Sequence, residues 1–262
     1  MIPFYFGSRE RKLFGVFEPA QNGGAKRAVL LCYPWGYEYV NSHRSMARLG
    51  TLLSHTGFHT LRFDYYGTGD SGGEDREADI EGSRRDIVTA IEELIELSGV
   101  ERVSIVGLRL GAMLGVAAAC EKPHLVDRIV LWDPVVEGGQ YLQELYNLDD
   151  SISIPGVGPA SYFSEELGGG REVMGLPMTH SVAAGISDLD LTSRLAQLPH
   201  ATYAVATRSS HLQRQLQALL EQRADGSAFE RLDDHPAWHE EWPENAGAIP
   251  VAVLNRIVSW LK

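Results

Sequence analysis

The stretch IVGLRLG, Ile105–Gly111, decides how the rest of the chain is interpreted. It ends an apolar, β-branched run that predicts a buried strand, and it leads into LGAMLGVAAAC, an alanine-rich run that predicts a tightly packed helix. Gly107 and Gly111 lie two residues before and two residues after Arg109, which allows a strand and a helix to approach each other closely. The stretch therefore predicts a sharp strand-to-helix turn with Arg109 at its centre, pointing into a pocket.

Arg109 stands where the pattern Gly-x-Ser-x-Gly places a nucleophilic serine. A guanidinium, with a pKa above about 12, has no usable lone pair near neutral pH. It can neither attack a carbonyl nor accept a proton, so a covalent acyl-enzyme through this residue is excluded. It can hold a carboxylate, a phosphate or a developing oxyanion through forked, charge-assisted hydrogen bonds.

Length and composition favour one compact α/β domain. The 262 residues, 44% of them hydrophobic, suffice for a sizeable core with an insertion. The formal net charge of −12 is spread without long runs of one sign, which argues against nucleic acid or an anionic membrane as the main partner. We therefore expect a small-molecule or acyl substrate as the partner, and the sequence leaves the oligomeric state open, with a homodimer as one option.

Cysteine usage and the N-terminal sequence bear on the compartment. Cys32 and Cys120 both lie in apolar runs, so we expect small buried thiols in a reducing compartment and no disulfide framework. The first residues lack a basic segment followed by an apolar stretch, and no run of about 18 apolar residues occurs. These observations predict a cytoplasmic location without membrane insertion.

We expect no metal and no cofactor. His235 and His239 share a four-residue spacing, but Pro236 between them makes a helical metal pair unfavourable.

Strand-like and helix-like segments alternate along the chain, which is typical of a mostly parallel sheet covered by helices on both faces. The expected strands cover residues 2–8, 12–20, 28–34, 58–67, 102–108, 127–134, 201–210 and 227–234. The expected helices cover residues 42–56, 79–97, 110–120, 211–222 and 249–262.

The alternation stops between residues 137 and 195, where short pieces are punctuated by glycine and proline. We interpret residues 137–195 as a lid or cap inserted into a core made of residues 1–136 and 196–262. A flexible linker is the alternative, but Tyr162, Phe163, Met174 and Leu176 are residues that favour burial.

These motifs resemble the α/β-hydrolase superfamily over nearly the whole chain. LRFDYYGTGDSGG at 61–73 is similar to the fourth-strand motif of serine-aminopeptidase-like hydrolases, and VSIVGLRLGAMLG at 103–115 is similar to their nucleophile elbow. The segments at 33–45, 131–142 and 173–191 resemble hydrolase-like proteins associated with bacterial exosortase systems and their relatives in biosynthetic gene clusters, where an arginine at the elbow recurs.

The resemblance implies the α/β-hydrolase fold with an eight-stranded, mostly parallel sheet and a site at the carboxyl ends of the strands. It also implies an oxyanion loop after the third strand, here YPWGYE from Tyr33 to Glu38. Pro34 has no N–H group, so oxyanion donors would come from Trp35, Gly36 or the amide of Leu110. Glu38 is placed where it could pair with Arg109, because a buried arginine needs a partner from the protein or from a substrate.

The remaining catalytic positions also follow from the resemblance. Asp133 ends the sixth strand, where part of the superfamily keeps its acid, although an aspartate before proline also caps turns. His235 follows the last strand, where the histidine loop of the family begins, although a solvated loop histidine is the alternative. Tyr162 in the insertion would contact an apolar part of a substrate. Asp70 and Ser71 are expected in a structural turn.

Three hypotheses for function remain. In the first, Arg109 anchors a carboxylate or an enolate oxygen, while His235, oriented by Asp133, moves a proton or activates water. The reaction would be a proton transfer, an isomerisation, an elimination or a direct hydrolysis, without a covalent intermediate. In the second, Arg109 is paired with Glu38 or Asp133, and the protein is a catalytically silent binding or assembly partner. In the third, a displaced nucleophile hydrolyses an ester, thioester or peptide; the candidates are Ser161, Ser209 and Ser210.

Overall fold

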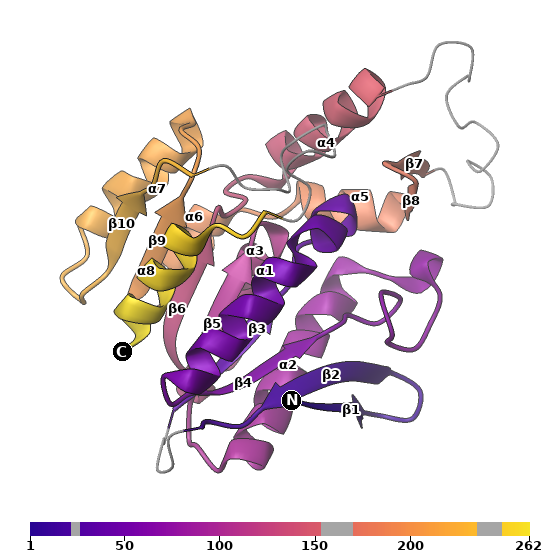
Figure 1. The fold of residues 1–262 in the computed structure, drawn as a ribbon. Helices are drawn as coiled ribbons and strands as arrows, with labels where there is room; N and C mark the ends of the chain where they lie inside the picture. The colour runs from indigo at the N-terminus through magenta and orange to yellow at the C-terminus, as the bar shows by residue number, and fades with distance from the viewer. Residues whose placement is uncertain (22–26, 153–169, 235–247) are drawn as a thin grey trace.

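An eight-stranded sheet forms the centre of the computed structural model, which describes residues 1–21, 27–152, 170–234 and 248–262 (Figure 1). Its strands run in the order β1-β2-β4-β3-β5-β6-β9-β10. The hairpin β1–β2 and the pair β2–β4 are antiparallel, and all other neighbours are parallel. The bounds are β1 Ile2–Gly7, β2 Lys12–Glu18, β3 Ala28–Cys32, β4 His59–Phe63, β5 Val103–Leu108, β6 Val126–Trp132, β9 Thr202–Ala206 and β10 Ala228–Arg231.

Helices cover both faces of the sheet, as the alternating pattern predicted. Figure 1 shows α1 and α8 on one face and α2 and α3 on the other. The bounds are α1 Gly36–His55, α2 Ile80–Ser98, α3 Leu110–Glu121, α7 His211–Glu221 and α8 Val251–Leu261, with short 3-10 turns η1 Asp75–Glu77 and η2 Pro123–Leu125. Strands β3 and β5 are buried along their whole length, because a central parallel strand is covered on both sides.

The first of these helices begins earlier than the sequence predicted. We expected a start near Ser42, but α1 begins at Gly36, directly after the third strand and its loop. The aromatic and β-branched residues of YEYV concealed the first turn, because such residues have weak helix propensity. The early start places Glu38 in the first turn, where the helix dipole favours a negative charge.

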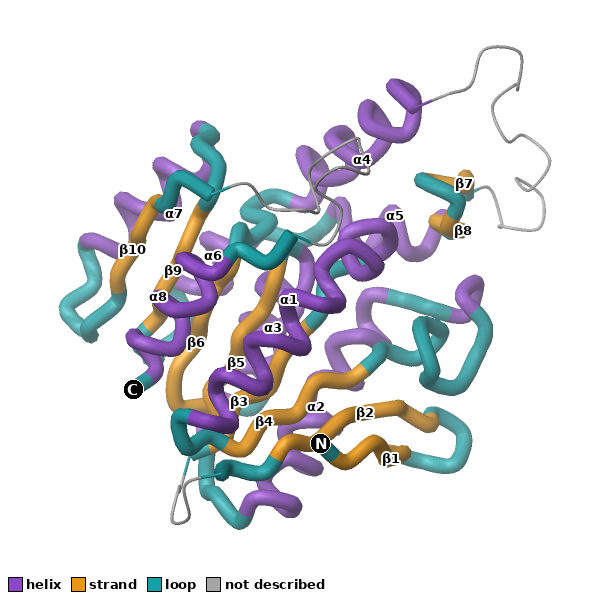
Figure 2. The backbone as a smooth tube through the Cα atoms, viewed as in Figure 1, coloured by secondary structure: helices purple, strands orange, loops and turns teal. Residues whose placement is uncertain are grey.

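The described elements of the segment 137–195, which we interpret as an insertion, are α4 Gly138–Ile152, β7 Arg171–Val173, β8 Leu176–Met178, α5 His180–Ser187 and α6 Leu191–Leu195. The helices α4 and α5 and the hairpin β7–β8 lie beyond the carboxyl ends of the central parallel strands (Figure 1 and Figure 2). The expectation of short irregular pieces was wrong for α4, a helix of 15 residues. Side-chain pairs four residues apart, such as Gln143 with Asn147, support this helix, and Tyr141, Leu142 and Leu145 form its buried side. Tyr162 lies outside the described residues.

Candidate functional site

The turn between β5 and α3 has the geometry of a nucleophile elbow. Arg109 adopts φ 52° and ψ −118°, a backbone conformation that costs free energy for a residue with a side chain. A Cβ at Gly107 would overlap the backbone of Ala112, and one at Gly111 would overlap the carbonyl oxygens of Cys32 and Tyr33. The two glycines are therefore required by close packing, and they hold Arg109 at the apex of the turn.

The Arg109 guanidinium is held by partners from three separate elements. Its Nε donates to Oε1 of Glu38 on α1 at 2.8 Å, and its Nη1 donates to the carbonyl oxygen of Asp133 at 3.2 Å. On the insertion, Oε2 of Glu144 lies 3.5 Å from its Nη2. The other carboxylate oxygen of Glu38 accepts a hydrogen bond of 2.7 Å from the hydroxyl of Tyr141, whose ring also lies near the guanidinium. The elbow, α1 and α4 are thus joined by one polar network.

This network is buried. Arg109 is 7% exposed and Glu38 is 4% exposed, so each charge depends on the other for compensation. Burial, the largest single effect, would lower the pKa of Arg109, but the charge and hydrogen bond of Glu38 together with Tyr141 and Glu144 outweigh it and raise the pKa above its ordinary value. Burial and the charge of Glu38 likewise raise the pKa of Tyr141 well above its usual range, so its hydroxyl remains protonated and continues to donate. Arg109 is a permanent cation in this site.

Asp133 is directed toward β9 and not toward the guanidinium. Its backbone has φ 41°, and its two carboxylate oxygens accept hydrogen bonds from the amide of Thr207 at 2.6 Å and from the hydroxyl of Thr207 at 2.8 Å. Burial raises the pKa of Asp133, although the bonds from Thr207 counteract part of this effect. The carboxylate ties the ends of β6 and β9 together, and the contact of Asp133 with Arg109 runs through its backbone carbonyl. His235, its expected partner, lies outside the described residues.

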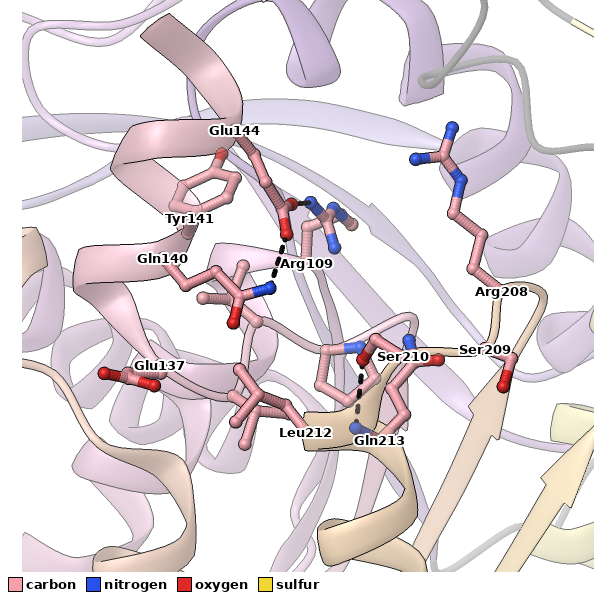
Figure 3. Close-up of a pocket in the computed structure, with 13 residues that line it drawn as sticks. Arg109, Glu137, Gln140, Tyr141, Glu144, Arg208, Ser209, Ser210, Leu212 and Gln213 are labelled. Carbon is pink, nitrogen blue, oxygen red and sulfur yellow. Dashed lines mark hydrogen bonds and ion pairs between the residues drawn. The ribbon is translucent and has the colours of Figure 1, made fainter. Parts of the chain in front are cut away.

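A polar cavity of about 210 Å³, hereafter the polar cavity, lies against Arg109 (Figure 3). Figure 3 shows α4 on one side, with Glu144 directed at Arg109 and Glu137 directed away from it. The opposite side comes from the segment after β9, including Arg208, Ser209 and Ser210. A second cavity, of about 390 Å³, shares Arg109, Tyr141, Glu144 and Arg208 with the first and extends toward Glu38.

Two of the three serines proposed as displaced nucleophiles, Ser209 and Ser210, line this polar cavity, and Ser210 has a structural role. Ser210 is the N-cap of α7, and its hydroxyl oxygen accepts from the amide of Gln213 at 3.1 Å. Such a bond satisfies an otherwise unpaired amide at the start of a helix. Ser209 contributes to the cavity wall, and Ser161 lies outside the described residues.

A third cavity, hereafter the apolar cavity, has about 460 Å³ and contains the other predicted substrate-binding residues. Trp35, Gly36 and Leu110 all line it, together with the turn after β4 and the hairpin β7–β8. Among the residues that the structure describes, none lines both the apolar cavity and the polar cavity. The predicted site residues are therefore divided: Glu38 contacts the Arg109 side chain, and the residues expected to supply oxyanion donors line a separate cavity.

Sequence reasoning missed Tyr141 and Glu144, which contact the Arg109 network from α4. Their spacing of three residues puts both on one face of a helix, but that signal is visible only once α4 is recognised as helical. Asp70 and Ser71 lie in the predicted turn: the amide of Asp70 donates to Asp64, and the hydroxyl of Ser71 donates to the backbone of Asp64.

Comparisons with known proteins agree with this architecture. The family model described as serine aminopeptidase, S33, matches residues 38–153. Among solved structures, Est1E from Butyrivibrio proteoclasticus with bound ferulic acid has a TM-score of 0.69 at 13% identity, covering 99% of this chain and 96% of its own. The enol-lactonase from Burkholderia xenovorans LB400 has a TM-score of 0.61 at 17% identity (98% and 99% covered), and the proline iminopeptidase from Mycobacterium smegmatis has 0.65 at 13% (99% and 97% covered). No curated protein matches the sequence.

The chain therefore has the α/β-hydrolase fold, with the eight-stranded, mostly parallel sheet and the strand-to-helix turn that the sequence predicted. The match to the serine aminopeptidase model and the structural neighbours support the resemblance to the α/β-hydrolase superfamily. Within the described ranges, no helix combines the length and the apolar character needed to cross a membrane.

Proposed function

We propose that this protein binds a small molecule with a carboxylate or acyl group at the elbow, without forming an acyl-enzyme. Arg109 would act as the anchor, in a pocket that the insertion covers as a lid. The setting in a bacterial biosynthetic pathway, suggested by the resemblance to exosortase-associated proteins, is part of the same proposal.

The observation that carries this proposal is the asymmetry of the Arg109 contacts. The Nε edge faces Glu38, a buried carboxylate that compensates the charge permanently. The Nη2 atom faces Glu144, whose side chain is 52% exposed and lies at the longer distance of 3.5 Å. Exposed ion pairs contribute little free energy, roughly 0.2–1 kcal/mol. A ligand carboxylate could therefore replace Glu144 at Arg109 while Glu38 keeps the elbow folded.

Acid/base chemistry is the catalytic part of the proposal. Arg109 would stabilise the negative charge that develops on a carboxylate or carbonyl oxygen when a neighbouring carbon loses a proton. His235 would accept that proton, as the position of the family histidine suggests. Among the neighbours, Est1E is the one described with ferulic acid, a carboxylic acid, bound to it.

A chemically silent binding partner is the second candidate. The direct ion pair between Arg109 and Glu38 favours it, because both charges are already compensated within the protein. The two candidates share the ligand site and differ only in whether a proton is transferred.

Binding at Arg109 is tested by calorimetric titration of benzoate and succinate into the wild type and two variants, Glu144→Gln and Glu137→Gln. Glu144→Gln removes the competing carboxylate and should strengthen binding by up to about fivefold, the equivalent of about 1 kcal/mol. Glu137→Gln is the matched control, since Glu137 lies on the same cavity wall but points away from Arg109. If Glu144→Gln binds no more tightly than Glu137→Gln, Arg109 is not the anchor.

Proton transfer is tested with a set of carboxylic and acyl compounds in heavy water, followed by NMR. The enzyme hypothesis predicts deuterium exchange at the carbon beside the carbonyl, and it predicts that His235→Gln abolishes the exchange while binding persists. Binding without exchange for every compound that binds would support the silent candidate.

A further inference from the structure

The apolar cavity adjoins the elbow through Leu110, whereas the polar cavity adjoins it through Arg109. Its walls come from the loop after β3, the turn after β4, the start of α3 and the hairpin β7–β8. Aromatic and aliphatic side chains dominate these walls, including Trp35, Leu110, Leu114 and Ile80. A volume of about 460 Å³ lies within the range of small-molecule sites.

Six hydroxyl-bearing side chains also line the apolar cavity, and five of them donate hydrogen bonds to acceptors within the protein. Tyr39 donates to the carboxylate of Asp64, and Tyr65 donates to the backbone carbonyl of Tyr33. The other three donate to backbone carbonyls as well: Thr68 to that of Tyr65, Ser71 to that of Asp64 and Ser83 to that of Asp79. These five hydroxyls already have acceptors, so a polar substituent beside them would lose its water without a replacement donor from them. The sixth hydroxyl belongs to Tyr33, a buried residue.

We propose that the apolar cavity binds a hydrocarbon group, an aliphatic chain or an unsubstituted ring. The proposal does not depend on the role of Arg109, because no lining residue is shared with the polar cavity. Burial of apolar surface supplies the free energy of binding, at about 25 cal/mol per Å² removed from water. The five hydroxyl groups that donate to internal acceptors disfavour polar ligands and so contribute to the selectivity.

Access to the cavity passes Val40, which lines it and is 62% exposed on α1. An exposed valine on a helix surface tolerates a larger residue, so Val40→Trp should narrow the entrance without disturbing the core. Val251 provides a matched control: it is 60% exposed, lies on α8, and does not line the apolar cavity.

The experiment is a thermal-shift and calorimetric titration with neutral probes, the n-alkanols from butanol to decanol and, for rings, naphthalene. We expect the melting temperature to rise with alkanol concentration and affinity to increase with each added methylene until the cavity is full. Val40→Trp should weaken binding by at least about tenfold, whereas Val251→Trp should bind like the wild type. Hexane-1,6-diol, which adds one polar group to the chain, should bind more weakly than hexan-1-ol.

Three results would overturn the proposal: no stabilisation by any neutral probe, equal binding by the two tryptophan variants, or equal affinity for the diol and the alkanol. If Val40→Trp is not folded, Ala78→Phe, which fills the cavity from the turn before α2, takes its place. The Glu144→Gln variant separates this proposal from the previous one, because it should change carboxylate binding and leave alkanol binding unchanged.

Discussion

Removing the carboxylate of Glu38 should destabilise the protein strongly, because it leaves the Arg109 charge without its buried partner. Breaking a buried ion pair from one side costs about 3–5 kcal/mol. For a domain of this size, each kcal/mol lowers the melting temperature by roughly 2–4 °C. We therefore expect Glu38→Gln to lower the melting temperature by about 6–20 °C.

The assay is urea unfolding followed by tryptophan fluorescence, applied to a double-mutant cycle of Glu38→Gln and Arg109→Met. Methionine retains a Cβ, so the backbone strain at φ 52° is the same in every member of the cycle. Each single variant leaves one uncompensated charge, and the double variant leaves neither. The double variant should therefore be more stable than the sum of the single effects predicts, by about 2 kcal/mol or more.

A more exposed ion pair serves as the control. Arg171 contacts Asp149 at 2.6 Å, with side chains that are 40% and 24% exposed. Asp149→Asn should cost no more than about 1 kcal/mol, because solvent screens such pairs. The reasoning is refuted if Glu38→Gln costs no more than Asp149→Asn, or if the cycle is additive within about 0.5 kcal/mol.

Three further predictions concern the elbow. A fluorophosphonate probe should leave the native protein unlabelled, since Arg109 cannot attack phosphorus; stoichiometric labelling in a mass spectrum would reveal another nucleophile. Gly111→Ala should lower the free energy of unfolding by about 1–3 kcal/mol or more, because its Cβ would overlap backbone carbonyls, whereas Gly139→Ala in α4 should be neutral or stabilising. Burial raises the pKa of Asp133 above the ordinary 3.8. Above that pH the folded protein holds the Asp133 proton more tightly than the unfolded chain does, so this group lowers the free energy of unfolding as the pH rises. Asp133→Asn removes that effect, so the stability of this variant relative to the wild type should increase as the pH rises above 3.8. A difference in urea unfolding that does not change with pH would contradict the assignment.

Local sequence patterns were sufficient for most of the fold. The eight strands, their helices and the elbow were predicted because apolar periodicity and glycine spacing are properties of short segments. The errors occurred where local signals are weak. The first turn of α1 is rich in aromatic residues, and α4 begins with two glycines, Gly138 and Gly139. Both kinds of residue have weak helix propensity, so the sequence did not indicate where either helix starts.

The sequence indicated individual residues of the candidate site, but it did not indicate how their side chains contact one another. Glu38 was correctly named as a partner for Arg109, because a buried cation requires a counter-charge. The carboxylate of Asp133 instead contacts Thr207, a residue that no motif singled out. Predictions that involve His235 and Tyr162 concern residues outside those described.

The sequence by itself determined that a permanent cation, Arg109, occupies the turn where related folds keep a nucleophile. Its chemistry excludes an acyl-enzyme through this residue, whichever residues surround it. Tertiary structure alone decided which groups surround that cation, since Glu38, Tyr141 and Glu144 approach it from helices distant in the chain. It also decided that the elbow separates a polar cavity from an apolar one. The physical reason is that side-chain identity sets the charge of a group, whereas its partners and its access to solvent depend on how distant segments pack.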